Sequence, residues 1–177
     1  MWLVVQTPAD AESRLSAPVD YQDYVSMQQQ QKDQWCWAAS GNTIAAYHGV
    51  SLSQTRFCQL AHNESGADCA NLPGTLADPQ RAFAKLGFAS SGTYVYGRIS
   101  YAAIQSQTAA DQPVETRIGW NSGGGHMHVL YGYDTSKSWV YWGDPWPSNN
   151  RYNWSTYDYY AGNSSFTWTH TLTGISR

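Results

Sequence analysis

The chain has 177 residues, of which 42% are hydrophobic, 15% aromatic and 13% charged. A chain of this length can bury one sizeable core but is short for two domains, and its composition excludes disorder along most of its length. The formal net charge is −3, which provides no basic surface for a phosphate backbone, so we expect no nucleic-acid partner. No apolar run approaches the roughly 20 residues that a bilayer-spanning helix needs, so we expect no membrane span.

Residues 1–24 show no sustained periodicity and contain Pro8 and Pro18. We interpret them as an extended N-terminal arm that leads into a single domain of residues 25–177. The first residues have neither a basic lead nor a long apolar stretch, so no signal peptide is visible. We expect either a mature or excised domain or a protein that leaves its cell without such a signal.

The stretch "WCWAASGNTIAAYHG" gives the first strong helix pattern. It is rich in alanine, contains no proline and ends at Gly49, a typical residue after a helix C-terminus. The pattern predicts a helix over residues 36–48. Cys36 therefore falls in the first turn of that helix.

Two further helices are predicted before the pattern changes to strands. "TLADPQRAFAKLGF" predicts a short helix with Asp78 as N-cap and Gly87 as terminator, and "ISYAAIQSQTAADQP" predicts another, capped by Ser100. After Pro113 apolar and polar residues alternate, and "HMHVLYGYD", "KSWVYWGDP" and "SSFTWTHTLTG" are rich in β-branched and aromatic residues. Helices first and strands last predict an α+β fold, in which an N-terminal helical half packs on a C-terminal antiparallel sheet.

Cys36 is a candidate nucleophile because of its place at a helix N-terminus. Unpaired amides and the helix dipole favour negative charge there, and the thiolate is the reactive form of cysteine. A small buried core residue is the alternative interpretation of a lone cysteine.

A candidate base follows three glycines in "NSGGGHMHVLYGYD". The glycines permit a close backbone approach to a cleft where a strand begins. On that strand His126 and His128 face one side of the sheet and Met127 the other. His126, at the mouth of the strand, is the better candidate, and a strand-end histidine bonded to backbone is the alternative.

Two more residues could complete such a site. Asp144 ends the next predicted strand, where a carboxylate could orient the imidazole, although an aspartate before proline is also a common turn residue. Gln30 lies six residues before Cys36, so its amide could lie beside the Cys36 N–H and stabilise an oxyanion. Glutamines in a "QQQQ" run are otherwise usually solvated. Trp146, two residues after Asp144, could shield the aspartate from water or belong to the core.

Taken together, a Gln six residues before Cys-Trp-Ala, a later Gly-Gly-His that opens a strand, and Asp-Pro-Trp resemble the papain-like cysteine proteases. The motifs look most like a compact bacterial branch, which includes type III effector proteases and is related to bacteriocin-processing peptidases. The resemblance spans about residues 25–147 and implies a papain-like catalytic domain. It implies Cys36 as nucleophile, His126 as general base and acid, Asp144 as orienting group and Gln30 as oxyanion donor.

This resemblance implies a cysteine endopeptidase that acts on proteins or peptides and needs no cofactor or metal. We expect Trp35, Gly124 and Gly125 to contact the substrate. The bacterial character of the motifs suggests a secreted effector or toxin domain, delivered to a target cell by a specialised route. Such a toxin would be restrained in its producer by a cognate immunity or inhibitor protein.

Other functions stay open at this stage. The same groups serve other thiol acyl transfers, such as those of a deamidase or a transglutaminase. The pair His126 and His128 with a cysteine and an aspartate could instead bind zinc, although no Cys-x-x-Cys or His-x-x-x-His spacing supports this. The aromatic tail "YNWSTYDYYAGNSSFTWTH" could present rings to a ligand as a non-enzymatic binding module.

Cys58 and Cys69 form a separate pair, eleven residues apart in a stretch that we interpret as a polar loop. They could close a disulfide. Two reduced thiols are an equally weighted alternative, because the sequence does not fix the redox compartment.

Overall fold

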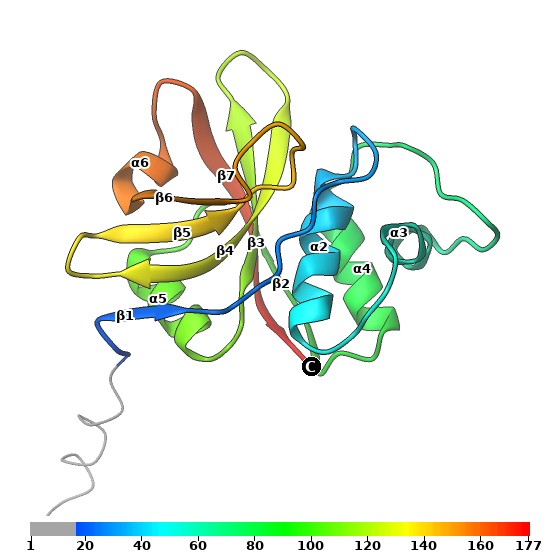
Figure 1. The fold of residues 1–177 in the computed structure, drawn as a ribbon, viewed down its shortest axis with the longest axis horizontal. Coiled ribbons are helices and arrows are strands. Elements are labelled where there is room, and N and C mark those ends of the chain that lie inside the picture. Colours follow the sequence, from blue (N-terminus) through cyan, green and yellow to red (C-terminus); the bar gives the residue numbers. More distant parts are fainter. Residues whose placement is uncertain (1–16) are drawn as a thin grey trace, which may run out of the picture.

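The computed structural model describes residues 17–177 (Figure 1). Residues 1–16, the first part of the expected N-terminal arm, lie outside the described residues. The next part of that arm contains β1 (Asp20–Gln22), which pairs antiparallel with the far end of β4 (Gly125–Asp134). These three residues are therefore a strand of the sheet.

The three expected helices are present, but the order of elements is mixed, because one strand precedes the helices and another lies between the third and fourth of them. The helices are α2 (Cys36–Tyr47), α3 (Gln54–His62), α4 (Ala77–Lys85), α5 (Tyr101–Ala109) and the short α6 (Tyr157–Ala161). The remaining strands are β2 (Ser90–Val95), β3 (Val114–Trp120), β5 (Trp139–Gly143), β6 (Tyr152–Thr156) and β7 (Phe166–Ser176).

Seven strands form one antiparallel sheet in the order β2-β7-β3-β4-β5-β6, with β1 beside β4. The last strand, β7, lies between β2 and β3, so the chain's C-terminal segment returns to an inner position of the sheet, next to the edge strand β2. β4 is central, because it pairs with β3, β5 and β1. Residues of β4 therefore lie close to α2 on one face of the sheet and close to the ends of the neighbouring strands β3 and β5.

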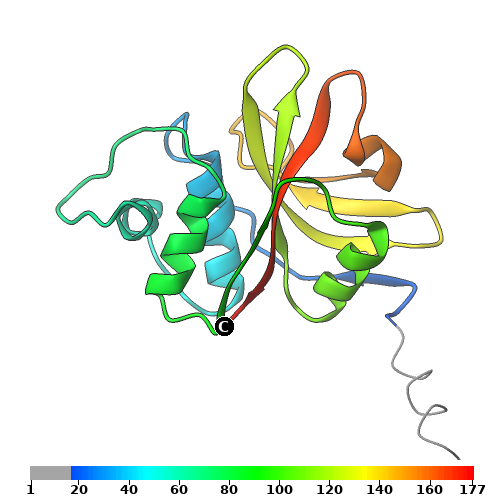
Figure 2. The same cartoon turned by 180° about the vertical axis from the view of Figure 1, so that it is seen from behind.

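Helices cover both faces of the sheet (Figures 1 and 2). On one side α2, α3 and α4 bury a core that includes Trp37, Phe57 and Met127. On the other side α5 and α6 cover a second core that includes Ile104 and Trp168. The α+β class is confirmed, with the helical half packed on an antiparallel sheet. Within residues 17–177, no helix is both long and apolar enough to cross a membrane.

The helix that begins at Cys36 is confirmed, and its neighbours explain its composition. A Cβ atom at Gly41 would come within 2.6 Å of the Phe57 ring and 2.9 Å of Pro79, so only glycine allows α3 and α4 to pack this closely. Gly49 follows the helix with φ of +86°, the left-handed conformation that ends helices. The small residues of α2 thus serve close helix packing.

Two local expectations were wrong. Asp78 is not the N-cap of its helix, because α4 begins at Ala77 and the Asp78 carboxylate, in the first turn, accepts the Thr75 N–H at 2.8 Å. Cys58 does not lie in a loop but in α3, whose N-cap Ser53 accepts the Arg56 N–H at 3.0 Å. The expected cap at Ser100 is confirmed, since its hydroxyl accepts the Ala103 N–H at 3.0 Å.

Candidate active site

The structure brings Cys36, His126 and Asp144 to one end of the sheet. Cys36 is the first residue of α2, His126 is the second residue of β4, and Asp144 directly follows β5. The antiparallel pairing of β4 with β5 opposes Val129 to Gly143, which carries Asp144 back toward His126. Cys36 and His126 line a cleft of about 380 Å³. The other residues that line it are Asp33, Gln34, Trp120, Gly125, Trp146 and Asn149.

Two fully buried tryptophans hold the start of α2 in place. The indole N–H groups of Trp35 and Trp37 donate to the backbone carbonyls of Ala70 and Leu72, each at 3.1 Å. The expectation that Trp35 contacts the substrate is therefore wrong, because its ring lies inside the core. The Cys36 side chain between them is half-buried and is the only one of the three cysteines outside a disulfide.

His126 is held between a carboxylate and aromatic rings. Its Nε2 lies 2.7 Å from Asp144 Oδ1, and its ring stacks on Trp120 with centroids 6.3 Å apart. Burial of the ring opposes its positive charge, but interactions with Asp144 and with Cys36 outweigh burial and raise the pKa of His126 to about 9. The imidazole therefore carries its proton at neutral pH.

Asp144 is the most heavily bonded carboxylate of the site. Besides His126, it accepts the Trp146 backbone N–H and the Asn149 side-chain amide, both at 2.9 Å. Burial opposes its charge, but hydrogen bonds and charge interactions with His126 and His128 hold the pKa of Asp144 well below its usual value. The hydrogen bond from the Trp146 N–H is typical of a turn formed by an aspartate before proline. The Asp144 side chain therefore both stabilises this turn and contacts the His126 imidazole.

His128 has a different environment from His126, although both face the same side of the sheet as expected. It is 2% exposed, does not line the cleft, and its Nδ1 lies 3.1 Å from the Tyr160 hydroxyl. Its Nε2 is 3.4 Å from Asp144 Oδ2, a longer and poorly aligned contact. Burial lowers the pKa of His128, so this ring is neutral while His126 is charged. The two histidines can therefore have separate roles.

The Gln30 amide does not point into the cleft. Its Nε2 donates to the carbonyls of Lys32 at 3.0 Å and Asp33 at 2.9 Å, within the loop that enters α2. Gln34, an exposed residue of the same loop, lines the cleft instead. The N–H of Cys36 is one of the amides at the helix start that have no partner within the helix.

The expected glycines lie at the rim of the cleft. Gly125 lines it, and a Cβ atom there would come within 2.5 Å of the Arg117 guanidinium. Gly124 is next to the cleft, in the turn between β3 and β4, with φ of +78°. The backbone conformation favours glycine at Gly124, whereas a side chain at Gly125 would require the flexible Arg117 guanidinium to move.

One group at the site has the composition of a metal centre. One ligand atom from each of His126, His128 and Asp144 lies within 4.8 Å of the others. The hydrogen bond from His126 to Asp144 uses the same atoms, so a metal would have to replace it. A larger hollow of about 620 Å³ lies over β6 and contains none of these side chains.

Comparison with known proteins places this geometry in a family. The family model of the papain-like cysteine protease AvrRpt2 matches residues 19–163. The chain belongs to this family. It is therefore a papain-like cysteine protease, a hydrolase, and the resemblance drawn from the motifs is confirmed. No curated protein sequence matches the chain.

Solved structures of a cysteine protease and of two other peptidases share the fold of this peptidase. Xylellain, a cysteine protease from Xylella fastidiosa, is 13% identical, with a TM-score of 0.61 over 92% of this chain and 88% of xylellain. The peptidase domain of Streptococcus ComA, a bifunctional ABC transporter, is 17% identical, with a TM-score of 0.63 over 84% of this chain and 96% of that domain. A double glycine motif protease from an AMS/PCAT transporter, solved with its leader peptide, is 16% identical, with a TM-score of 0.53 over 89% of this chain and 95% of the protease.

Several residues of the peptidase's cleft were not predicted from the sequence. Trp120 and Asn149 gave no signal, because Trp120 is the last residue of β3, Asn149 lies in the turn-rich stretch after β5, and only the fold brings both to the cleft. Trp146 was expected either to shield Asp144 or to lie in the core. It is 39% exposed and its ring meets His126 edge-on with centroids 6.5 Å apart.

Proposed function

We propose that the chain is an endopeptidase that cleaves proteins through Cys36, His126 and Asp144. The observation that carries the proposal is the His126 imidazole, which lines the cleft together with Cys36 and lies 2.7 Å from Asp144 Oδ1 behind it. An imidazolium that keeps its proton at neutral pH is the partner that a thiolate needs. This pairing supports His126, and not His128, as the base.

The chemistry follows from these positions. The Cys36 thiolate attacks the carbonyl carbon of a peptide bond, which forms a C–S bond and moves charge to the oxygen. His126 gives its proton to the departing nitrogen as the C–N bond breaks and a thioester forms. Water, deprotonated by His126, then attacks the thioester and releases the acid and the thiolate.

The oxyanion requires hydrogen-bond donors near Cys36. The Cys36 N–H at the helix start is one donor, and Gln30 is proposed as the second. Gln30 can donate to the substrate only if its amide leaves one of the carbonyls of Lys32 and Asp33, which hold it in the resting protein. Its burial beside the entry to α2 supports either this role or the fixing of that loop.

The experiment that tests the mechanism compares purified wild-type protein with Cys36→Ala on a denatured-protein substrate. The variant should fold normally and show no cleavage above background. Mass spectrometry of the products separates the alternatives, because hydrolysis gives new termini, deamidation converts a glutamine to glutamate, and transglutamination joins two chains. Cleavage at the wild-type rate by Cys36→Ala would exclude the mechanism.

The biological setting is a further part of the proposal. We propose a secreted effector or toxin that acts on proteins of another cell and is restrained in its producer by an immunity or inhibitor protein. The support is the AvrRpt2 family match and the resemblance of the motifs to effector proteases. Deletion of the restraining gene should kill the producing strain only when Cys36 is intact, and survival of the intact strain would count against this setting.

A further inference from the structure

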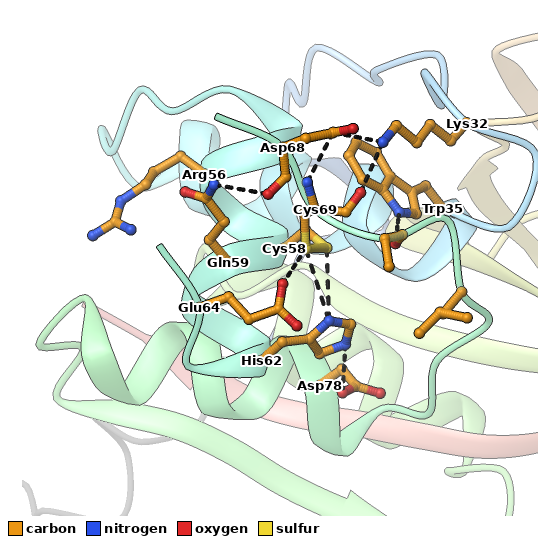
Figure 3. The surroundings of a disulfide bond; sticks show 12 residues. Lys32, Trp35, Arg56, Cys58, Gln59, His62, Glu64, Asp68, Cys69 and Asp78 are labelled. Atoms are coloured by element: carbon orange, nitrogen blue, oxygen red, sulfur yellow. Dashed lines mark hydrogen bonds and ion pairs between the residues drawn. A yellow bond between two sulfur atoms is a disulfide. The ribbon is translucent and has the colours of Figure 1, made fainter. Parts of the chain in front are cut away.

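Apart from the active site, one other cluster of metal-binding side chains lies in the described part of the chain, on α3 and the loop that follows it (Figure 3). The Cys58 and Cys69 sulfurs form a disulfide, and the His62 Nδ1 lies 3.8 Å from each sulfur. The Glu64 carboxylate approaches the Cys69 sulfur from the exposed side at 3.7 Å. The two sulfurs and the His62 nitrogen therefore converge on one point, and the Glu64 carboxylate lies beside one of the sulfurs.

We propose that this cluster binds a zinc ion when the disulfide is reduced, with Cys58, Cys69, His62 and Glu64 as ligands. Two thiolates, an imidazole and a carboxylate are all ligands that zinc accepts. Zinc–ligand bonds of about 2.0–2.3 Å place neighbouring ligand atoms of a tetrahedron about 3.5 Å apart. The sulfur–nitrogen and sulfur–oxygen distances already lie close to that value.

The outer side of His62 supports the assignment. Its Nε2 faces the buried carboxylate of Asp78 at 3.4 Å, and Asp78 is itself paired with Arg81. Histidines that bind metals usually donate their second ring N–H to such a carboxylate, which fixes the tautomer with Nδ1 open toward the ion. Disulfide sulfurs are weak hydrogen-bond acceptors, so the disulfide alone gives little reason for the ring to face them.

The change from disulfide to zinc site is small. A dithiol reductant supplies two electrons to the two sulfurs and becomes a disulfide itself, and zinc then displaces the two thiol protons. The Cα atoms of Cys58 and Cys69 are 6.2 Å apart, so side-chain rotation is enough to separate the sulfurs to the about 3.7 Å that two zinc-bound thiolates require.

Either cross-link would tie the loop after α3 to that helix. This loop supplies the carbonyls of Ala70 and Leu72 that hold Trp35 and Trp37, and the His62 ring packs on Trp37 with centroids 5.2 Å apart. The segment around the nucleophile would therefore keep its support in both oxidising and reducing compartments.

The test uses the full chain with Cys36→Ala, which removes the active-site thiol. Half of the sample is reduced with dithiothreitol and transferred to metal-free buffer without oxygen, and half stays oxidised. The reduced sample should bind one more equivalent of zinc than the oxidised one, which still contains His126, His128 and Asp144. With cobalt(II), only the reduced sample should show a thiolate-to-metal charge-transfer band.

Variants of the ligands give a second readout. In the reduced Cys36→Ala chain, His62→Ala and Glu64→Gln should each weaken zinc binding by at least about tenfold. His170→Ala, a histidine away from the cluster, should leave the affinity unchanged. Equal zinc binding by reduced and oxidised protein, or unchanged affinity in both ligand variants, would overturn the proposal. Because Glu64 is exposed, its variant keeps the test informative even if His62→Ala fails to fold.

Discussion

The Nε2 atom of His126 lies 2.7 Å from Oδ1 of Asp144, and both side chains are 8% exposed. An ion pair that is shielded from water this well holds a proton on the imidazole much more strongly than an exposed pair would. The pH range in which the peptidase works should therefore depend on this single contact.

In Asp144→Asn, the activity should be lost at a lower alkaline pH than in the wild type, so the pH range of activity should be narrower. In the proposed mechanism His126 donates its proton to the leaving nitrogen, and its pKa of about 9 predicts that kcat/KM falls as the pH rises above about 9. Without the carboxylate, only the interactions with Cys36 still oppose the effect of burial, so the pKa of His126 falls and the alkaline limb should move to lower pH. The maximal kcat/KM should also fall by about 10² or more.

The measurement is a pH profile of kcat/KM with a fluorogenic peptide. Asp134→Asn, which removes an exposed carboxylate in the β4–β5 turn, is the matched control and should keep the wild-type profile. An alkaline limb at the same pH in Asp144→Asn would show that Asp144 does not set the protonation of His126.

Substitutions can distinguish the roles of Gln30 and Gln34, which both lie in the loop before α2. If the Gln30 amide leaves one of the backbone carbonyls to which it donates and binds the oxyanion instead, Gln30→Ala should lower kcat by about 10² to 10³ with little change in KM. Gln34→Ala, at the exposed cleft residue, should change kcat less than tenfold. The opposite ranking, measured by steady-state kinetics on folded proteins, would assign the oxyanion amide to Gln34.

Tyr160→Phe should destabilise the protein through His128. The Tyr160 hydroxyl lies 3.1 Å from His128 Nδ1 and 2.6 Å from Thr116 Oγ1, and all three side chains are buried. Loss of the hydroxyl leaves buried polar atoms without a partner, which costs about 1–3 kcal/mol of unfolding free energy. Urea denaturation measures it, and Tyr159→Phe, at a half-exposed neighbour, should change the free energy by less than about 0.5 kcal/mol.

Asp23 should make the stability of the fold depend on pH. This side chain is 1% exposed, and burial raises its pKa from 3.8 to about 7, against the opposing hydrogen bond from Tyr47. Because the folded state holds this proton more tightly than the unfolded state, the contribution of Asp23 to stability is lost as the pH rises from about 4 to about 7.

Asp23→Asn should remove that part of the pH dependence. Urea midpoints measured from pH 4 to 8 should decline less steeply with rising pH in Asp23→Asn than in the wild type. Asp20→Asn, on the exposed edge of β1, should follow the wild-type curve. Parallel curves for Asp23→Asn and the wild type would show that Asp23 ionises normally in the folded protein.

The sequence alone determined the features that depend on local order. The alanine-rich stretch and Gly49 located the helix that starts at Cys36, because propensity and helix termination act over a few residues. Alternation put His126 and His128 on one face of a strand, since that period is a property of the extended backbone. The spacing of the Gln, Cys, His and Asp-Pro-Trp motifs identified the family.

The tertiary structure alone decided how those residues are used. It separates the environments of the two histidines, because His126 lines the cleft with Cys36, whereas His128 is buried beside Tyr160. Burial of Trp35 likewise depends on a distant segment, because its indole N–H donates to the carbonyl of Ala70.

Long-range pairing also explains what was missed elsewhere. The place of β7 between β2 and β3 joins segments far apart in the chain, which no local pattern encodes. Helix α3 is mostly polar along its length, so its sequence pattern resembles that of a loop. Its Phe57 and Cys58 side chains nevertheless pack into the core. The residue types of the candidate site could be recognised from the sequence, whereas the positions and orientations of their side chains depend on packing between segments far apart in the chain.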